Sequence, residues 1–229
     1  MISAHLPAEW PSDQEAGRAE QERLRPLMRP DGVSVNDVRL VAGVDVSYAK
    51  DESIVAGAVV VLDARTRDVV ESATAIRPVE FPYVPGLLAF REIPALLDAL
   101  AKLRTAPDAI VCDGYGLAHP RRFGLACHLG VLVDVPTLGV AKTAFIGEYT
   151  QPAPERGAWS PLIDQDDTVG RVLRTQPNVK PVFVSTGHRI ALDVATDLAL
   201  SLAAQFRLPE TTRQADHLSR RVLAEAEAS

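Results

Sequence analysis

Apolar residues change their spacing along this chain, and the changes predict a mixed α/β fold. Three stretches rich in β-branched residues, separated by short polar turns, are typical of consecutive antiparallel strands; they cover residues 38–48, 54–62 and 69–79. From Leu87 to Leu103 the apolar positions instead recur at helical spacing. Pro94 lies inside this segment, and because it lacks an N–H it predicts a kink or a restart of the helix just after Glu92.

The second half of the chain predicts further alternation of strands and helices. A strand ends at Asp113, and a helix begins near Thr211 and ends in a polar tail. The segment 144–167 is rich in proline, glycine and acids, and we interpret it as a surface excursion. The remaining expected elements are a helix over 121–133, strands over 136–141, 168–175 and 181–186, and a helix over 189–206.

This order of elements predicts a central mixed β-sheet flanked by helices. With 229 residues, of which 47% are hydrophobic, one domain over residues 1–229 is expected. A helical N-terminal extension (1–35) is expected to pack on it, and residues 221–229 are expected to form a polar tail.

Composition narrows the class of protein. No apolar run is long enough to cross a bilayer and no secretory signal is visible, so a cytoplasmic protein without membrane partners is expected. Cys112 and Cys127 lie in apolar surroundings and are expected to be buried thiols. The net charge of −6 argues against a purely electrostatic nucleic-acid binder. The basic run 171–192 is either a local phosphate-binding patch or an ordinary solvated strand and turn.

Three acids carry the most information about chemistry. Asp45 and Asp113 each follow an apolar strand, and Glu92 lies on the flank of the apolar stripe of its helix, not on the solvated face. Taken singly, the two aspartates are equally well explained as turn residues. Together, the three predict an all-oxygen site for a hard divalent cation, because no Cys/His cluster has zinc spacing. Such a site, with Mg²⁺ or a substituting Mn²⁺, is typical of metal-assisted phosphodiester cleavage.

A stiff aromatic loop is the next candidate. Tyr83 lies between Pro82 and Pro85, which fix the backbone on either side of it. A rigid loop that presents an aromatic ring suits insertion into a base stack. The alternative is that Tyr83 packs on the sheet.

Three polar residues have two interpretations each. His119 lies in a loop downstream of the second aspartate and would reach the same strand end. Lys142 follows a strand, and either pairs with a phosphate or is a solvated loop lysine. His217, on the last helix, is either a surface histidine or a residue that reaches metal-bound water. His128, inside a helix, is expected to be a packed core histidine.

With these residues in view, the chain resembles endonuclease V, a family of deoxyinosine-directed repair nucleases. The resemblance covers roughly residues 38–220, and its motifs run in the family's order. They are GVDVSY (43–48), PYVPGLLAFREIP (82–94), DGYGLAHPRRFGLACHLG (113–130), GVAKT (139–143), STGHRIAL (185–192) and TTRQADHLSR (211–220).

The resemblance implies a ribonuclease H-like fold and a role for each matching residue. Asp45 and Asp113 match metal-binding aspartates, Glu92 matches a helix glutamate that helps to bind metal and position water, and His217 matches a histidine at the edge of the active site. Pro82, Tyr83 and Pro85 match a wedge that separates the strands at the lesion, and Lys142 matches a lysine near the phosphate. The positions that match the pocket for the flipped-out base are Gly86, Leu88, Gly114, His119 and Leu125.

The resemblance also implies the reaction and the partners. The family cleaves the second phosphodiester on the 3′ side of a deaminated base and leaves a 3′-hydroxyl and a 5′-phosphate. The expected partner is DNA containing deaminated bases, with inosine-containing RNA as a further substrate, and the expected state is a monomer. Tyr115 departs from the family's pattern, where the position holds a smaller or imidazole side chain.

Two other classes of function fit these residues less well. A module that binds deaminated bases without cutting would have no use for three converging acids. A kinase of the actin-like fold also opens on a Gly-x-Asp strand, but it would need glycine-rich phosphate loops that the chain lacks. The choice between DNA and RNA stays open, because contacts to a 2′-hydroxyl cannot be inferred from sequence.

Overall fold

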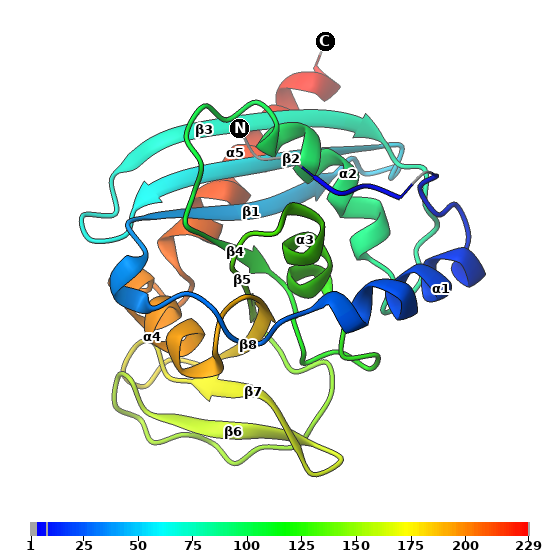
Figure 1. The fold of residues 1–229 in the computed structure, drawn as a ribbon. Coiled ribbons are helices and arrows are strands. Elements are labelled where there is room, and N and C mark those ends of the chain that lie inside the picture. The colour runs from blue at the N-terminus through cyan, green and yellow to red at the C-terminus, as the bar shows by residue number, and fades with distance from the viewer. Residues whose placement is uncertain (1–3, 8, 229) are drawn as a thin grey trace.

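One eight-stranded mixed sheet organises the chain (Figure 1). The computed structural model describes residues 4–7 and 9–228. The strand order across the sheet is β3-β2-β1-β4-β5-β8-β7-β6. The strands are β1 (Leu40–Tyr48), β2 (Ile54–Asp63), β3 (Val69–Pro78), β4 (Ala109–Asp113), β5 (Thr137–Ala141), β6 (Trp159–Asp164), β7 (Asp167–Leu173) and β8 (Val182–His188).

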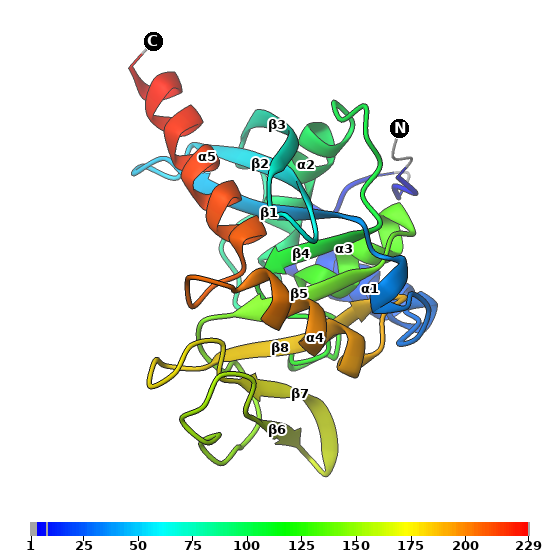
Figure 2. The ribbon, with the colours of Figure 1, turned by 90° about the vertical axis from the view of Figure 1, so that its left-hand side faces the viewer.

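Helices cover both faces of this sheet, as the sequence predicted. They are α1 (Gln14–Leu24), α2 (Ala89–Leu100), α3 (Leu125–Val133), α4 (Leu192–Leu202) and α5 (Glu210–Glu227), with short 3₁₀ turns at Arg25–Leu27 and Val35–Asp37. One apolar core lies between the sheet and α2 and α3, and a second lies between the sheet and α4. Figure 2 shows α5 crossing the sheet on the side opposite α2 and α3. No helix among the described residues is long and apolar enough to span a membrane.

The centre of the sheet is the part that positions the site. β1 pairs with β4 in parallel, and β4 pairs with β5 in parallel, whereas the other neighbouring strands are antiparallel. The carboxyl ends of β1, β4 and β5 therefore meet at one edge of the sheet. Side chains just beyond these strand ends are brought together even though they are far apart in the sequence.

Three predicted boundaries are wrong. The segment 144–167 is not only a surface excursion, because it contains β6, which pairs with β7 and forms an edge of the sheet. Pro161 is tolerated there since an edge strand has one side free of ladder hydrogen bonds. The polar tail 221–229 continues α5 to Glu227, because alanine and glutamate are good helix formers. The helix expected over 121–133 begins only at Leu125, after Gly124.

Helix α2 continues across Pro94, so the predicted restart after Glu92 does not occur. Proline cannot donate to the carbonyl four residues earlier, which is that of Phe90. The indole N–H of Trp10 donates to this carbonyl at 3.0 Å. The N-terminal segment thus supplies the donor that the helix lacks.

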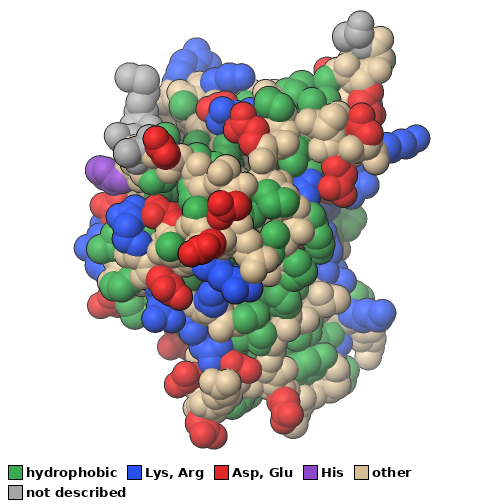
Figure 3. All heavy atoms as spheres, turned by 90° about the vertical axis from the view of Figure 1, so that its right-hand side faces the viewer, with side chains coloured by type: hydrophobic (Ala, Val, Ile, Leu, Met, Phe, Trp, Pro, Cys, Tyr) green, Lys and Arg blue, Asp and Glu red, His purple; other side chains and the backbone are tan. Residues whose placement is uncertain are grey.

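The basic run 171–192 is used inside the protein. Arg171 forms an ion pair with Asp193, and Arg189 forms one with Asp134. Arg174 donates to the backbone carbonyls of three residues in neighbouring loops, Pro152, Ala153 and Val179. On the face drawn in Figure 3, basic and acidic side chains are interspersed. A broad basic field is therefore absent from that face, and phosphate recognition falls to local groups.

Buried groups in the core match their predicted surroundings. Cys112 and Cys127 are free and buried, as expected. His128 is fully buried among the rings of Trp10, Phe90 and Phe123. Burial lowers the pKa of His128 to about 3, so its imidazole is neutral. Neither ring nitrogen has a hydrogen-bond partner among the described residues.

Replacing His128 with leucine should therefore stabilise the protein. An unpaired buried polar group costs free energy, and leucine fills a similar volume without that cost. After the loss of some ring contacts, the expected gain is about 1 kcal/mol, or roughly 2–4 °C in Tm. Thermal unfolding of His128→Leu and wild type measures it. A lower Tm for the variant would show that the imidazole has a stabilising partner.

Candidate active site

Asp45 and Asp113 lie side by side at the meeting point of two parallel strands. Val44 of β1 is in register with Cys112 of β4, so the next residue of each strand is an aspartate. Neighbouring positions in a parallel pair point to the same face of the sheet. Asp113 ends β4, whose other residues are buried, whereas Asp45 follows the buried run 41–44 inside β1, which continues to Tyr48. The pairing of β1 with β4 thus places the two acids together, one within β1 and one at the end of β4.

Glu92 brings a third acid to this place from α2. It lies in the first turn of the helix, is only 8% exposed, and acts electrostatically on Asp45. Burial, with repulsion from Asp45 and Asp113, raises the pKa of Glu92 to about 8. Burial, with repulsion from Asp113 and Asp216, also raises the pKa of Asp45 to about 8. Positive charge placed between these two acids would favour their ionised forms.

Lys142 is the cation nearest to the aspartates. It follows the last residue of β5, and its Nζ lies 2.6 Å from Oδ2 of Asp113. Its side chain remains about half exposed, at 48%. Of the two sequence-based interpretations, a free solvated loop lysine is therefore wrong. The ammonium group is held at the acids, where a phosphate would also be attracted.

The last helix contributes an acid that the sequence analysis did not select. Asp216 acts on Asp45 and on Lys142, whereas His217 is exposed and acts on Glu210. His217 therefore does not lie at the acids in this structure, and the adjacent Asp216 faces them instead. Gly43 makes the close crossing of α5 possible, because a Cβ there would lie 2.2 Å from the backbone of Thr211.

Helical periodicity contained the signal for Asp216. The buried positions of α5 include Thr212, Ala215 and Ser219. Residue 216 lies four after Thr212 and three before Ser219, and so shares their face. Residue 217 is rotated away from that face by another 100°.

The donor set fits a hard divalent cation in its chemistry. Asp45, Glu92, Asp113 and Asp216 offer only carboxylate oxygens, and such ligands suit Mg²⁺ or Mn²⁺. Burial and repulsion between the acids raise the pKa of Asp45 and of Glu92, so a bound cation would favour their charged forms. Within the described part of the chain, however, no three acidic, histidine or cysteine side chains are arranged as a closed metal site. The ion pair of Asp113 with Lys142 directs one of the carboxylates to the lysine instead.

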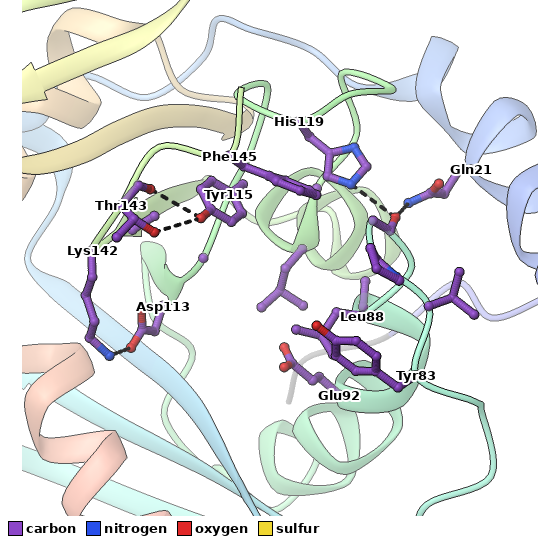
Figure 4. A pocket seen from close by; sticks show the side chains of 18 residues that line it. Gln21, Tyr83, Leu88, Glu92, Asp113, Tyr115, His119, Lys142, Thr143 and Phe145 are labelled. Atoms are coloured by element: carbon purple, nitrogen blue, oxygen red, sulfur yellow. Dashed lines mark hydrogen bonds and ion pairs between the residues drawn. The ribbon is translucent and has the colours of Figure 1, made fainter. Parts of the chain in front are cut away.

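A cavity of about 380 Å³ opens beside the acids (Figure 4). Glu92 and Asp113 form part of its wall, next to Lys142. All the residues predicted for the base pocket line it, namely Gly86, Leu88, Gly114, His119 and Leu125. Burial lowers the pKa of His119 to about 4, so this ring is neutral near pH 7. The cavity therefore combines an apolar floor with neutral hydrogen-bonding groups, as a site for a heterocyclic base requires.

Aromatic side chains stand at the mouth of this cavity. Tyr83 is 67% exposed, so it does not pack on the sheet. Arg91 lies 5.8 Å from its ring centroid. On the other side, the ring of Phe145 lies 5.2 Å from Tyr115 and 5.6 Å from His119. Tyr115, the departure from the family's pattern, thus supports the rim and donates to the carbonyl of Thr143 at 3.2 Å.

The fold and the acids define a nuclease with a ribonuclease H-like fold. The chain belongs to the endonuclease V family, whose family model matches residues 23–217. It is 54% identical over 230 residues to the endonuclease V of Streptomyces avermitilis, covering 100% of both chains. The endonuclease V structure from Bacillus subtilis superposes with a TM-score of 0.93 at 30% identity, covering 99% of each chain.

A third relative was solved with nucleic acid. The endonuclease V of Ciona intestinalis is 29% identical, with a TM-score of 0.80, and the comparison covers 91% of this chain and 97% of that one. Its structure is a complex with a 24mer DNA that contains an inosine followed by a ribo-adenosine.

Proposed function

We propose that this chain is a divalent-metal-dependent DNA repair endonuclease. It hydrolyses the second phosphodiester bond 3′ to deoxyinosine, and leaves a 3′-hydroxyl and a 5′-phosphate. Mg²⁺ is the proposed cofactor, with Mn²⁺ as a substitute. The observation that carries the proposal is the pair of aspartates on the adjacent strands β1 and β4, beside a base-sized cavity. Family membership and the inosine-DNA complex of the Ciona intestinalis relative support the substrate.

The acids and the lysine divide the work at the phosphate. Asp45, Asp113 and Glu92 would hold the cation, and Asp216 adds a fourth carboxylate. When bound, the cation supplies activation of water and neutralises charge on the leaving 3′ oxygen. Glu92 would help to hold the cation and to position the attacking water. Lys142 attracts the phosphate with its ammonium group.

The cavity holds the lesion while the bond is cut. A base taken out of the stack costs a few kcal/mol, and least where pairing is already weak, as for inosine. Gly86 and Gly114 have positive φ angles, 80° and 155°, so a side chain at either place in the wall would be strained. Leu88 and Leu125 contact the faces of the base, and His119 lies at its polar edge.

A nicking assay tests this function. The substrate is end-labelled duplex DNA with one deoxyinosine, incubated with Mg²⁺, with Mn²⁺ or with EDTA. The expected result is a single metal-dependent cut at the second bond 3′ to the lesion. An inosine-specific gel-shifted complex without cutting would instead indicate a binding module, and an EDTA-resistant cut would exclude the metal.

Inosine in RNA is the second proposed substrate. The relative from Ciona intestinalis binds DNA in which a ribonucleotide follows the inosine, so a ribose is accepted beside the lesion in that protein. The same assay with a ribonucleotide in that position, and with inosine-containing RNA, compares the two sugars.

We place this enzyme in the cytoplasm, as a monomer.

Tyr83→Ala should weaken cleavage of inosine in duplex DNA more than in single-stranded DNA. An exposed ring on a proline-flanked loop can fill the gap that a flipped base leaves, and only a duplex has such a gap to fill. Loss of one stacking ring should cost roughly tenfold in kcat/KM on duplex. Tyr149→Ala, which removes another exposed tyrosine, is the matched control. Equal losses of kcat/KM on duplex and single-stranded DNA would show that Tyr83 does not act as a wedge.

A further inference from the structure

The backbone carbonyl of Gly86 is held by three side chains from two other parts of the chain. Gln21 Nε2 donates to it at 3.1 Å, and His119 Nε2 lies 3.0 Å away. Arg121 Nη2 donates to the same oxygen. Gly86 closes the loop that carries Tyr83, and its φ of 80° is in the left-handed region that favours glycine. Three donors on one carbonyl fix this end of the loop.

Gln21 is the centre of the arrangement. Its side-chain nitrogen also donates to the carbonyl of Phe123 at 3.1 Å, and its oxygen accepts from Arg121 Nε. The amide thus uses both donors and its acceptor. The residue is 1% exposed, so these bonds are not replaced by water. A buried amide satisfied in this way is costly to disturb.

These contacts join the two walls of the cavity. Gly86 belongs to the wall formed by the Tyr83 loop (79–88). Phe123 immediately precedes Gly124 and α3, and belongs to the wall formed by residues 114–125. Gln21, a residue of α1, donates hydrogen bonds from its side chain to both walls of the cavity. Figure 4 shows Gln21 at the cavity rim beside His119, with its amide directed at this carbonyl.

We propose that Gln21 is a positioning residue that sets the width of the base pocket and the place of the Tyr83 wedge. The N-terminal helix α1 is thereby part of the lesion-recognition apparatus. The effect on catalysis rests on the proposed function, whereas the effect on the two loops does not. Gln21 lines the cavity but has no hydrogen bond to the acids or to Lys142, so its effect on them would pass through the two loops.

Gln21→Met separates the hydrogen bonds from packing, because methionine has nearly the same shape and no polar amide. The carbonyl of Phe123 loses this donor, and the carbonyl of Gly86 loses one of three. Gln21→Glu is the second variant: it keeps an acceptor for Arg121 but turns a carboxylate oxygen toward two carbonyls. Both variants should loosen the loops. Gln14→Met makes the same change at an exposed position of the same helix and is the matched control.

Hydrogen exchange of the free protein tests the clamp without substrate. In both Gln21 variants, amides of 84–88 and 116–124 should exchange at least tenfold faster than in wild type, while the β1 and β4 amides keep their rates. Gln14→Met should match wild type throughout. Unchanged exchange in the two loops of a folded Gln21→Met would overturn the proposal. A circular dichroism spectrum establishes that the variant is folded.

Kinetics on inosine-containing duplex test the consequence for recognition. Gln21→Met should raise KM roughly tenfold, the size of one lost buried hydrogen bond, and leave kcat within about twofold. A lower kcat at unchanged KM would overturn the positioning role. If wild type itself does not cut this DNA, the proposed function fails, and the exchange experiment alone then decides on the clamp.

Discussion

Asp45→Asn should abolish strand cleavage while the protein still binds inosine-containing DNA. Asparagine keeps the shape of the side chain and removes the negative charge that a cation requires. Removal of one such group from a site that acts as a unit lowers the rate by on the order of 10³-fold or more. Binding should persist because the cavity residues are untouched, and because a neutral residue no longer repels Asp113 or the phosphate. Single-turnover nicking and a gel shift with the same DNA measure the two effects.

Asp113→Asn should give the same loss, and it also frees Lys142 from its ion pair. Asp197→Asn makes the same substitution at an exposed position of α4, and should cut at the wild-type rate. Nicking at the wild-type rate by either active-site variant would show that the cation is held elsewhere. If both aspartate variants fail to fold, Glu92→Gln takes their place in the comparison with wild type. It should likewise bind the DNA and not cut it.

The sequence could predict Asp45 and Asp113 because each follows an apolar run, where a carboxylate is unexpected, and Glu92 because it lies on the flank of an apolar helix stripe. It predicted the meander of the first three strands for a similar reason, since period-two patterns and polar turns are local signals. The adjacency of Asp45 and Asp113, however, depends on β1 and β4 pairing in parallel, with the paired residues 68 positions apart in the sequence. No local pattern fixes that pairing, and the family resemblance supplied it.

Features that depend on tertiary contacts were missed. β6 looked like a loop because Pro161 interrupts it, and only its place at the edge of the sheet permits the proline. Gln21 carries no motif, and its role is visible only once α1 lies against two loops. Helical periodicity could have identified Asp216. The sequence analysis instead selected the adjacent His217, because histidine is a common catalytic residue.

Without divalent ions, the stability of this protein should fall as the pH rises from about 4 toward 8. The pKa values of Asp45 and Glu92 are raised from 3.8 and 4.5 to about 8, because burial and mutual repulsion disfavour their charged forms. An acid with a raised pKa in the folded state contributes stability that is present below its unfolded pKa. That stability is lost as the pH rises through the folded value. The two acids together should cost on the order of a few kcal/mol across this window.

Acids with lowered pKa values act in the opposite direction at low pH. Hydrogen bonds from the backbone of Arg104 and from Thr105 lower the pKa of Glu71 to about 2. Such groups stabilise the folded state above their unfolded pKa and lose this effect as the pH falls. The metal-free protein should therefore be most stable in weakly acidic solution.

Mg²⁺ or Mn²⁺ should reverse the loss on the alkaline side. A cation that binds only the folded state stabilises it, and it binds best where the carboxylates have lost their protons. The rise in Tm on adding Mg²⁺ should thus be larger at pH 8.5 than at pH 5.5. Asp45→Asn should raise the Tm of the metal-free protein at pH 8.5 and abolish most of the Mg²⁺ effect. Asp197→Asn should do neither. Equal Mg²⁺-induced rises in Tm in Asp45→Asn and wild type would mean that the stabilising cation binds away from the proposed active site. The raised pKa values of Asp45 and Glu92 would then not be explained by a metal site.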